Sequence, residues 1–291
     1  MRIGIFAKTF VRGSVEEVFD AVKAHGITCV QFNMACCRGR PIAYYSGSTG
    51  EASLPESIED RLADTVRNAA SCRGIDIAAV SGTFNMIHPD MEQRRDGLRR
   101  LNVLAGACHG MGTSLITLCT GTRDPQNMWR RHPDNDTPDA WRDLQQSMRE
   151  AIQIADAHDI QLGIEPEVSN VINSAVKARR LLDEMGSPRL RIVMDAANLF
   201  HAGELARMHE VMDEAFELLG RDIAIAHAKD LSQDGQAGHE AAGTGVLDYD
   251  HYISLLRRYH FDGPLILHHL SEAQVPGCVR FLRSRLDQAR T

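Results

Sequence analysis

Short runs of β-branched and other apolar residues alternate with longer amphipathic segments along the whole chain. The apolar runs predict eight strands, at residues 3–7, 28–33, 75–82, 114–121, 160–167, 190–196, 222–230 and 263–270. The amphipathic segments predict eight helices, at about residues 14–24, 55–71, 90–109, 139–158, 173–185, 203–219, 248–259 and 275–289. Strands that alternate with helices imply parallel strands joined by right-handed crossovers.

Eight strand–helix units in 291 residues predict an α/β protein with a single (β/α)8 TIM barrel, one domain over residues 1–291. A doubly wound open sheet is the alternative. Such a sheet usually has a glycine-rich turn after its first strand, and AKTFVRG (7–13) matches GxGxxG poorly. The loop at 34–54 is too long for a simple connection. Apolar segments within 36–54 suggest a homodimer, by analogy with other barrels.

Composition excludes several classes of protein. Apolar residues make up 43% and charged residues 24% of the chain, which is ordinary for a globular protein. The net charge of −7 opposes a large nucleic-acid interface, and no apolar run is long enough for a membrane span. Seven cysteines, without a CxxC motif or a secretory signal, favour free thiols in a reducing cytoplasm.

Four consecutive predicted strands end in residues that bind metals. In a (β/α)8 barrel the active site lies at the carboxyl ends of the strands. There the sequence places Glu165, Asp195, His227 and His268. Two carboxylates and two imidazoles suit one divalent ion, Mn²⁺, Zn²⁺, Fe²⁺ or Co²⁺, better than Mg²⁺, which prefers oxygen ligands. Singly, such a carboxylate can be a helix cap or an ion-pair partner, and such a histidine can be a core residue.

The histidine pair after the last strand leaves its orientation open. Side chains alternate along a strand, so only one of His268 and His269 is expected to point into the barrel. Both faces of a barrel strand are buried, so periodicity does not choose between them. We take His268 as the ligand and leave His269 as a core histidine of the helix layer.

Other polar residues near the strand ends are candidates for substrate binding. The amides and hydroxyl of Asn33, Asn85, Thr120 and Asn198 can hydrogen-bond to substrate hydroxyls. Lys8 and Lys229 could meet a carboxylate or phosphate, or form ion pairs within the protein. The remaining candidates are Glu167, His201 and His239, of which His239 could equally be a solvent-exposed loop histidine.

Five segments carry a resemblance to a known family. GIEPE (163–167), MDAANLFH (194–201), AHAKD (226–230), GTGVLDYDHY (243–252) and FDGPLILHHLSEA (261–273) resemble the xylose-isomerase-like barrels. This superfamily holds the sugar phosphate isomerases/epimerases, ketose 3-epimerases, inosose dehydratase and endonuclease IV (AP endonuclease family 2).

In the ketose epimerases of this superfamily, a Glu, an Asp, a His and a second Glu hold one divalent metal. The resemblance assigns the first three roles to Glu165, Asp195 and His227. His268 stands where the second Glu is found, so one of the two glutamates that serve as paired acid and base is missing. Endonuclease IV uses a larger histidine cluster for three metals, which the other histidines of this chain do not fill.

The resemblance implies a metal-dependent isomerase or epimerase of a small sugar or polyhydroxy ketone. A bound metal would polarise the carbonyl group and stabilise the enediolate that forms on deprotonation. Glu165 or His268 would be the catalytic base. Two alternatives remain: a lyase like inosose dehydratase, which shares the first step, and a metal-free sugar-binding barrel. The expected partner is a small carbohydrate, with neither nucleic acid nor membrane.

Overall fold

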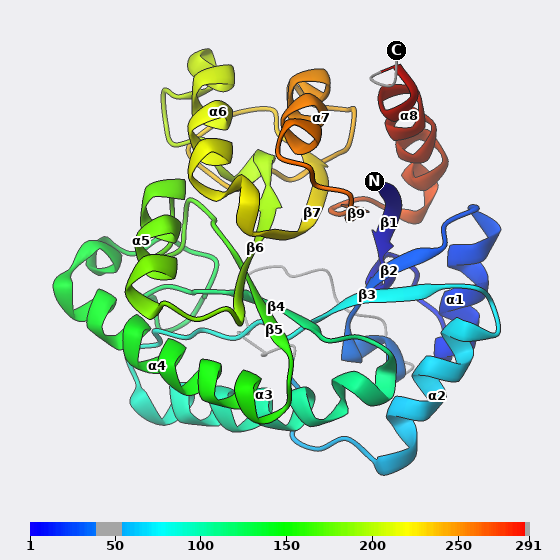
Figure 1. Cartoon of the computed structure of the whole chain (residues 1–291), viewed down its shortest axis with the longest axis horizontal. Coiled ribbons are helices and arrows are strands. Elements are labelled where there is room, and N and C mark those ends of the chain that lie inside the picture. Colours follow the sequence, from blue (N-terminus) through cyan, green and yellow to red (C-terminus); the bar gives the residue numbers. More distant parts are fainter. Residues whose placement is uncertain (39–53, 289–291) are drawn as a thin grey trace.

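A computed structural model describes residues 1–38 and 54–288 of the chain. Its eight parallel strands close into a barrel, and the helices α1 to α8 of the described residues surround them (Figure 1). The predicted (β/α)8 TIM barrel is therefore confirmed. The apolar segments proposed as a dimer contact fall largely within residues 39–53, outside the described residues.

The barrel strands pair in chain order, and β9 closes the ring between β7 and β1. Their bounds are β1 (Arg2–Phe6), β2 (Cys29–Phe32), β3 (Asp76–Ser81), β4 (Leu115–Cys119), β5 (Gln161–Glu165), β6 (Leu190–Asp195), β7 (Ile223–Asp230) and β9 (Pro264–Leu267). The two-residue strand β8 (Glu240–Ala241) lies antiparallel on the end of β7. The sequence did not predict β8, because two residues are too few for a periodic pattern.

Each predicted helix is present in the outer layer. The helices are α1 (Val15–Ala24), α2 (Asp60–Ser71), α3 (Met91–Met111), α4 (Pro138–Ala157), α5 (Ala175–Met185), α6 (Met208–Leu219), α7 (Tyr249–Arg258) and α8 (Val275–Gln288). Capping fixes several starts: the hydroxyl of Ser14 accepts from the backbone N–H of Glu17 at 3.2 Å. Helix α6 begins five residues later than predicted, after the left-handed Gly203 (φ 87°) and a short 3₁₀ turn.

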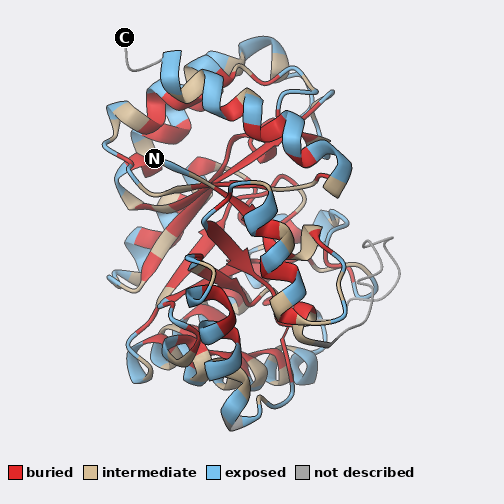
Figure 2. Ribbon diagram, turned by 90° about the vertical axis from the view of Figure 1, so that its right-hand side faces the viewer, coloured by how far each residue is buried: buried red, intermediate tan, exposed pale blue. Residues whose placement is uncertain are grey.

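Two apolar layers hold the barrel together. The larger lies between strands and helices, where the buried faces of the helices meet the sheet (Figure 2). The smaller fills the barrel interior and takes one side chain from each of seven strands: Phe6, Cys29, Ala79, Leu115, Val193, Ile225 and Ile266. Gly163 completes this ring on β5, where a Cβ would approach Val193 to 2.9 Å. The interior is thus full at this level, and any cavity must lie above it.

The structure also bears on two expectations from composition, those about membrane spans and about disulfides. Within the described residues, no helix has the length and apolar character needed to cross a bilayer. None of the seven cysteines, all of which lie within the described residues, forms a disulfide. The cellular compartment stays a prediction.

Tyr252→Phe should lower the free energy of unfolding. The buried Tyr252 hydroxyl on α7 lies 3.0 Å from the carbonyl oxygen of Met194 and 3.1 Å from that of His227. Its removal takes a buried donor from the strands that carry the metal-ligand candidates, at a cost of about 1–2 kcal/mol. Chemical denaturation measures this loss. Tyr259→Phe is the matched control. An equal loss of stability in both variants would contradict the role given to the hydrogen bonds of the Tyr252 hydroxyl.

A candidate metal centre at the carboxyl ends of the strands

A polar layer lies directly above the apolar ring. Side chains two residues apart on a strand share a face. Two residues beyond each interior position lies a polar side chain, on the strand itself or, for the first and last, just after β1 and β9 end. In chain order these are Lys8, Gln31, Ser81, Thr117, Glu165, Asp195, His227 and His268. The same two-residue step from Ile266 places His268 on the interior face. The candidate site residues taken from the sequence did not include Gln31, Ser81 and Thr117, because the two-residue spacing from the interior positions was not applied to every strand.

Three of these side chains could hold a metal ion. One ligand atom each from Asp195, His227 and His268 lies within 4.8 Å of the others, and this is the one such group among the described residues. Oδ2 of Asp195, Nδ1 of His227 and Nδ1 of His268 are buried and make no hydrogen bond. Such atoms are costly to bury unless they find a partner. A divalent cation among them would satisfy all three.

Glu165 lies beside this group. Its Oε1 is 3.5 Å from Nδ1 of His227, and Nδ1 in turn is 3.4 Å from Oδ2 of Asp195. Asn198 donates from Nδ2 to the same Oε1 at 2.8 Å, and the thiol of Cys119 lies 3.9 Å from Oε2. The Glu165 side chain is thus oriented by neighbours while it lines the cavity described below.

Gln31 controls the orientation of the His227 ring. Its amide group donates to Thr117 Oγ1 at 2.9 Å and to Ser81 Oγ at 3.2 Å, which directs the amide oxygen toward His227. That oxygen lies 2.8 Å from Nε2 of His227. Nε2 is therefore the donor, so Nδ1 faces Asp195 and Glu165, and the lone pair of the neutral form of the ring lies on Nδ1. Metal-binding histidines are commonly held in this way.

The charges around the centre favour a cation. Burial alone would lower the pKa of His227, but the carboxylates of Glu165 and Asp195 outweigh burial and raise it. They favour positive charge at Nδ1, and a bound cation would satisfy the same attraction. Burial, reinforced by His269 and Lys8, lowers the pKa of His268 well below its usual value. His268 is therefore neutral, with its lone pair available to a metal.

A cavity of about 520 Å³ opens above the polar layer. Glu165 and His268 line it, together with five of the predicted substrate-binding residues: Asn33, Glu167, Asn198, Lys229 and His239. Two of these side chains also have partners within the protein. Lys229 Nζ lies 3.3 Å from Oδ2 of Asp195. The carboxylate of Glu167 accepts from the backbone N–H of Ser169 and from Asn170.

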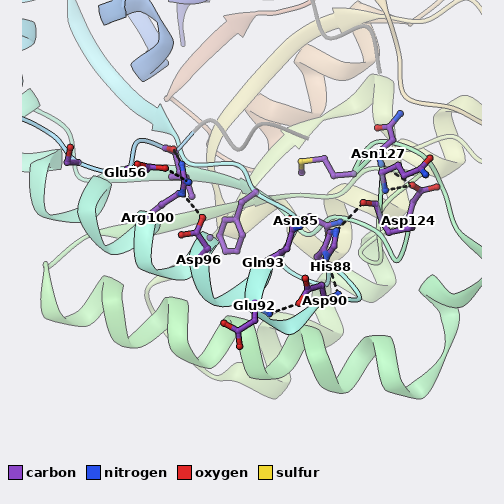
Figure 3. Close-up of a pocket in the computed structure, with 17 residues that line it drawn as sticks. Glu56, Asn85, His88, Asp90, Glu92, Gln93, Asp96, Arg100, Asp124 and Asn127 are labelled. Atoms are coloured by element: carbon purple, nitrogen blue, oxygen red, sulfur yellow. Dashed lines mark hydrogen bonds and ion pairs between the residues drawn. The ribbon is translucent and has the colours of Figure 1, made fainter. Parts of the chain in front are cut away.

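The structure places three other predicted substrate-binding residues outside this cavity. The side chain of Asn85 bonds to the backbone of Thr122, and it lines a separate, larger hollow of about 1130 Å³ (Figure 3). Thr120 is fully buried and accepts from the N–H of Ile172. His201 follows the 3₁₀ turn after β6 and its backbone N–H bonds to Glu204.

His269 departs from the expected strand alternation. Its backbone is left-handed (φ 52°), and it lies beyond the end of β9 at Leu267. His269 therefore lines the cavity beside His268, with their ring centroids 4.7 Å apart. The expectation that only one of the two points inward, with His269 in the helix layer, was wrong, since the alternation stops where the strand ends. Such strained backbone is concentrated at functional sites.

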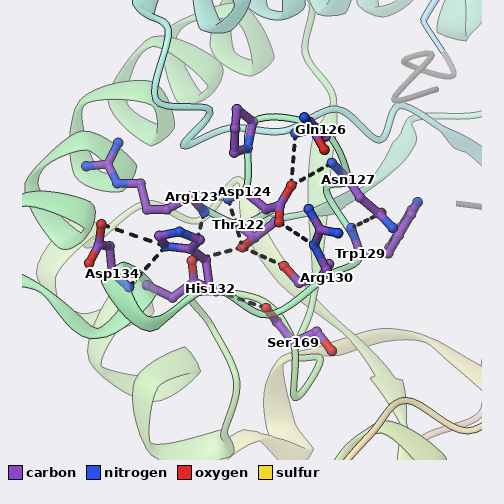
Figure 4. Close-up of polar contacts among 12 residues, drawn as sticks. Thr122, Arg123, Asp124, Gln126, Asn127, Trp129, Arg130, His132, Asp134 and Ser169 are labelled. Atoms are coloured by element: carbon purple, nitrogen blue, oxygen red, sulfur yellow. Dashed lines mark hydrogen bonds and ion pairs between the residues drawn. The ribbon is translucent and has the colours of Figure 1, made fainter. Parts of the chain in front are cut away.

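The loop after β4 forms one rim of the cavity. Figure 4 shows Asp124 at its centre, where the carboxylate accepts from the backbone N–H groups of Gln126 and Asn127 and pairs with Arg130. Arg131 pairs with Asp136. These ion pairs hold Arg130 and Arg131 at the rim of the cavity beside Trp129, and Asp136 also pairs with Lys177.

Comparisons with known proteins place the chain in a family. The model described as xylose isomerase-like TIM barrel matches residues 19–285. The chain is similar to a xylose isomerase domain protein from Planctomyces limnophilus, with a TM-score of 0.73 and 17% identity over 99% of this chain and 97% of that one. A D-tagatose 3-epimerase-like protein gives a TM-score of 0.75 and 12% identity over 100% and 98%.

A third similar structure is an IolI protein with a bound zinc atom. Its TM-score is 0.68, with 14% identity over 97% of this chain and 96% of that one. At such identities these structures show the fold alone. No curated protein matches the sequence.

Gln31→Leu should weaken metal binding. The variant keeps most of the side-chain volume but removes the acceptor that faces Nε2 of His227, so the ring is no longer held with Nδ1 toward the carboxylates. We expect the dissociation constant for Mn²⁺ or Zn²⁺ to rise about 10- to 100-fold, measured by competition with a chelating dye.

Two companion variants separate this role from a general effect on folding. Gln146→Leu, on the exposed face of α4, should leave the affinity unchanged. Gln31→Glu restores an acceptor and should recover most of the affinity. Wild-type affinity in Gln31→Leu would contradict the role given to Gln31.

Proposed function

Since the chain belongs to the xylose isomerase-like TIM barrel family, we propose that it is a divalent-metal-dependent enzyme that isomerises or epimerises a small polyhydroxy carbonyl compound. The reaction begins with removal of a proton from the carbon beside the carbonyl group, which gives an enediolate. Return of the proton to another carbon isomerises the substrate, and return to the opposite face epimerises it. Loss of a neighbouring hydroxyl would instead make the enzyme a dehydratase with the same first step.

The observation that carries this proposal is the convergence of three buried potential metal ligands, one carboxylate oxygen and two ring nitrogens. Asp195, His227 and His268 come from the ends of three adjacent barrel strands, and one ligand atom of each lies within 4.8 Å of the others. One carboxylate and two imidazoles, with Glu165 beside them, are a mixed oxygen and nitrogen set suited to Zn²⁺, Mn²⁺, Fe²⁺ or Co²⁺. When bound, such an ion supplies Lewis-acid stabilisation of negative charge on the substrate oxygens.

Glu165 is the residue we assign to proton removal. Its carboxylate lines the cavity at the edge of the ligand group, and Asn198 holds Oε1 in place. A carboxylate in that place can take the proton from the substrate carbon. His268 is better suited to a ligand than to an acid, because the lowered pKa of its buried ring leaves it without a proton to give at neutral pH.

The names of two similar structures agree with this proposal. One is a D-tagatose 3-epimerase-like protein, and another is an IolI protein with a bound zinc atom. Neither name establishes the substrate or the metal of this chain, because the likeness is one of fold.

Metal analysis of variants tests the ligand set. Wild-type protein stripped with a chelator and reloaded with Mn²⁺ or Zn²⁺ should hold about one ion per chain, as a site with these ligands does. Asp195→Asn and His268→Ala should each hold markedly less, because each loses a ligand atom. Glu217→Gln, an exposed carboxylate on α6, should match wild type. Full loading of His268→Ala would remove His268 from the ligand set.

Hydrogen exchange into the substrate tests the first chemical step. In D₂O, metal-loaded protein should introduce deuterium beside the carbonyl group of a ketose or an inosose, detected by NMR. Glu165→Gln should slow this exchange by about 10²- to 10⁴-fold, as expected when a general base is lost, while Glu217→Gln should not. Loading with metal but no exchange in any tested ketose or inosose would favour a binding protein. A product lighter by one water would assign the dehydratase.

A further inference from the structure

The cavity above the candidate metal centre is larger than a monosaccharide requires. Its volume is about 520 Å³. The twelve non-hydrogen atoms of a ketohexose need at most about 360 Å³, if each takes the ~30 Å³ of a molecule in liquid water. Covalently bonded atoms pack more closely than water molecules, so the true requirement is smaller. The cavity therefore has room for a further group on the substrate.

The walls of this cavity differ between its floor and its mouth. The floor is the polar layer, where Glu165 and His268 lie beside the other candidate ligands. Three apolar side chains line the cavity from segments beyond the strand ends: Val11 after β1, Trp129 after β4 and Leu270 after β9. The hydroxyl and carbonyl groups of a polyhydroxy ketone match the floor, but they do not match these three side chains.

The apolar side chains come from two sides of the mouth. Strands β9 and β1 are paired, whereas β4 is the fourth strand from β9 in the ring of eight. The segments after β1 and β9 are also joined by an ion pair, in which Arg12 donates to both carboxylate oxygens of Glu272, at 2.6 and 3.0 Å. Val11 precedes Arg12, and Leu270 lies two residues before Glu272. Val11 and Leu270 thus form one wall of the mouth, and Trp129 lies across from it.

Two of these side chains are held in an exposed position. Val11 is 50% exposed and Trp129 is 38% exposed. The backbone N–H of Trp129 donates to Oδ1 of Asn127 at 2.9 Å, within the hydrogen-bonded loop shown in Figure 4. An indole ring is a large, rigid apolar surface that loses little conformational entropy on binding. A ligand with an apolar face displaces water from both side chains when it covers them, which favours binding.

Resting on the proposed function, we propose that the substrate is a keto sugar that carries a second sugar ring on the carbon atoms remote from its carbonyl group. The carbonyl end lies on the floor beside Glu165, and the second ring binds at the mouth between Trp129 and the wall formed by Val11 and Leu270. A pyranose ring presents C–H groups on its faces, which pack against the apolar side chains, and hydroxyls at its edge, which stay in contact with water. A monosaccharide would leave both walls uncovered and would bind less tightly.

Calorimetric titration of Mn²⁺-loaded protein with ketoses of one and two rings tests this proposal. The ligands are D-fructose, isomaltulose and lactulose, in which a second sugar is attached at O6 or O4 of fructose, and turanose, in which it is attached at O3. We expect isomaltulose or lactulose to bind about tenfold or more tightly than D-fructose, because the second ring buries apolar surface. In turanose the second ring lies beside the carbonyl group, where the polar floor excludes it, so turanose should bind no more tightly than D-fructose.

Variants locate the second ring. Trp129→Ala and Val11→Ala should each reduce the preference for the two-ring ketose to about threefold or less, because each removes part of one wall. The controls are Met91→Ala on α3 and Val176→Ala on α5, which truncate exposed apolar side chains outside the cavity. Both controls should keep the full preference. The side chains of Trp129, Val11, Met91 and Val176 are all exposed, so the four variants should fold.

Fluorescence gives a second measurement that does not depend on truncating a wall. The chain has two tryptophans, Trp129 and Trp141. Trp141 lies on α4, where its Nε1 donates to Glu184 at 2.8 Å. In Trp141→Phe, Trp129 is the remaining tryptophan, and its emission should shift to shorter wavelength when the two-ring ketose removes water from the indole. Saturation with D-fructose should leave the emission unchanged. Emission that also stays unchanged on saturation with the two-ring ketose would overturn the proposal.

The failures of the two proposals look different. A protein that binds no Mn²⁺ contradicts the proposed function before any sugar is added. A protein that holds Mn²⁺ and introduces deuterium into D-fructose, but binds D-fructose as tightly as isomaltulose and lactulose, overturns the second-ring site alone. The second-ring site is also overturned if none of the ketoses binds at millimolar concentration, if turanose binds most tightly, or if the preference survives in both Trp129→Ala and Val11→Ala.

Discussion

The candidate metal centre depends on the cost of burying polar atoms that lack hydrogen bonds. Asp195, His227 and His268 each present an atom to the same small volume, and none of those atoms makes a hydrogen bond. The surrounding structure holds them there: Gln31 fixes the ring of His227, and the Tyr252 hydroxyl bonds to backbone beneath. The free energy spent on this arrangement is recovered when a cation binds to these atoms.

Barrel architecture explains why these residues come together from distant parts of the sequence. The apolar ring blocks the lower interior, so the next residue on each inward face has to end at the upper opening. Charged and amide side chains placed one step above the ring can reach both the cavity and one another. The polar layer therefore combines the candidate ligands on one side with Gln31 on the other, which is held by Ser81 and Thr117 and orients His227.

Sequence reasoning predicted the part of this design that follows from periodicity. The alternation of strands and helices predicted the barrel, and apolar runs that end in ionisable residues indicated Glu165, Asp195, His227 and His268. It could not place Asn85, Thr120 or His201, because loop geometry decides whether a polar side chain faces a cavity or bonds to backbone. It misplaced His269, since a left-handed residue after a strand breaks the alternation. Gln31 could have been predicted from the sequence, because it lies two residues after an apolar interior position on its strand.

The measurement that tests the central claim most directly is a crystal structure of the Mn²⁺-loaded protein with anomalous data at the manganese edge. We predict one anomalous peak, from a manganese ion coordinated by Oδ2 of Asp195 and by Nδ1 of both His227 and His268. Nε2 of His227 should keep its hydrogen bond to Gln31. A fully loaded crystal with the peak elsewhere, or with His227 turned so that Nε2 binds the ion, would contradict it.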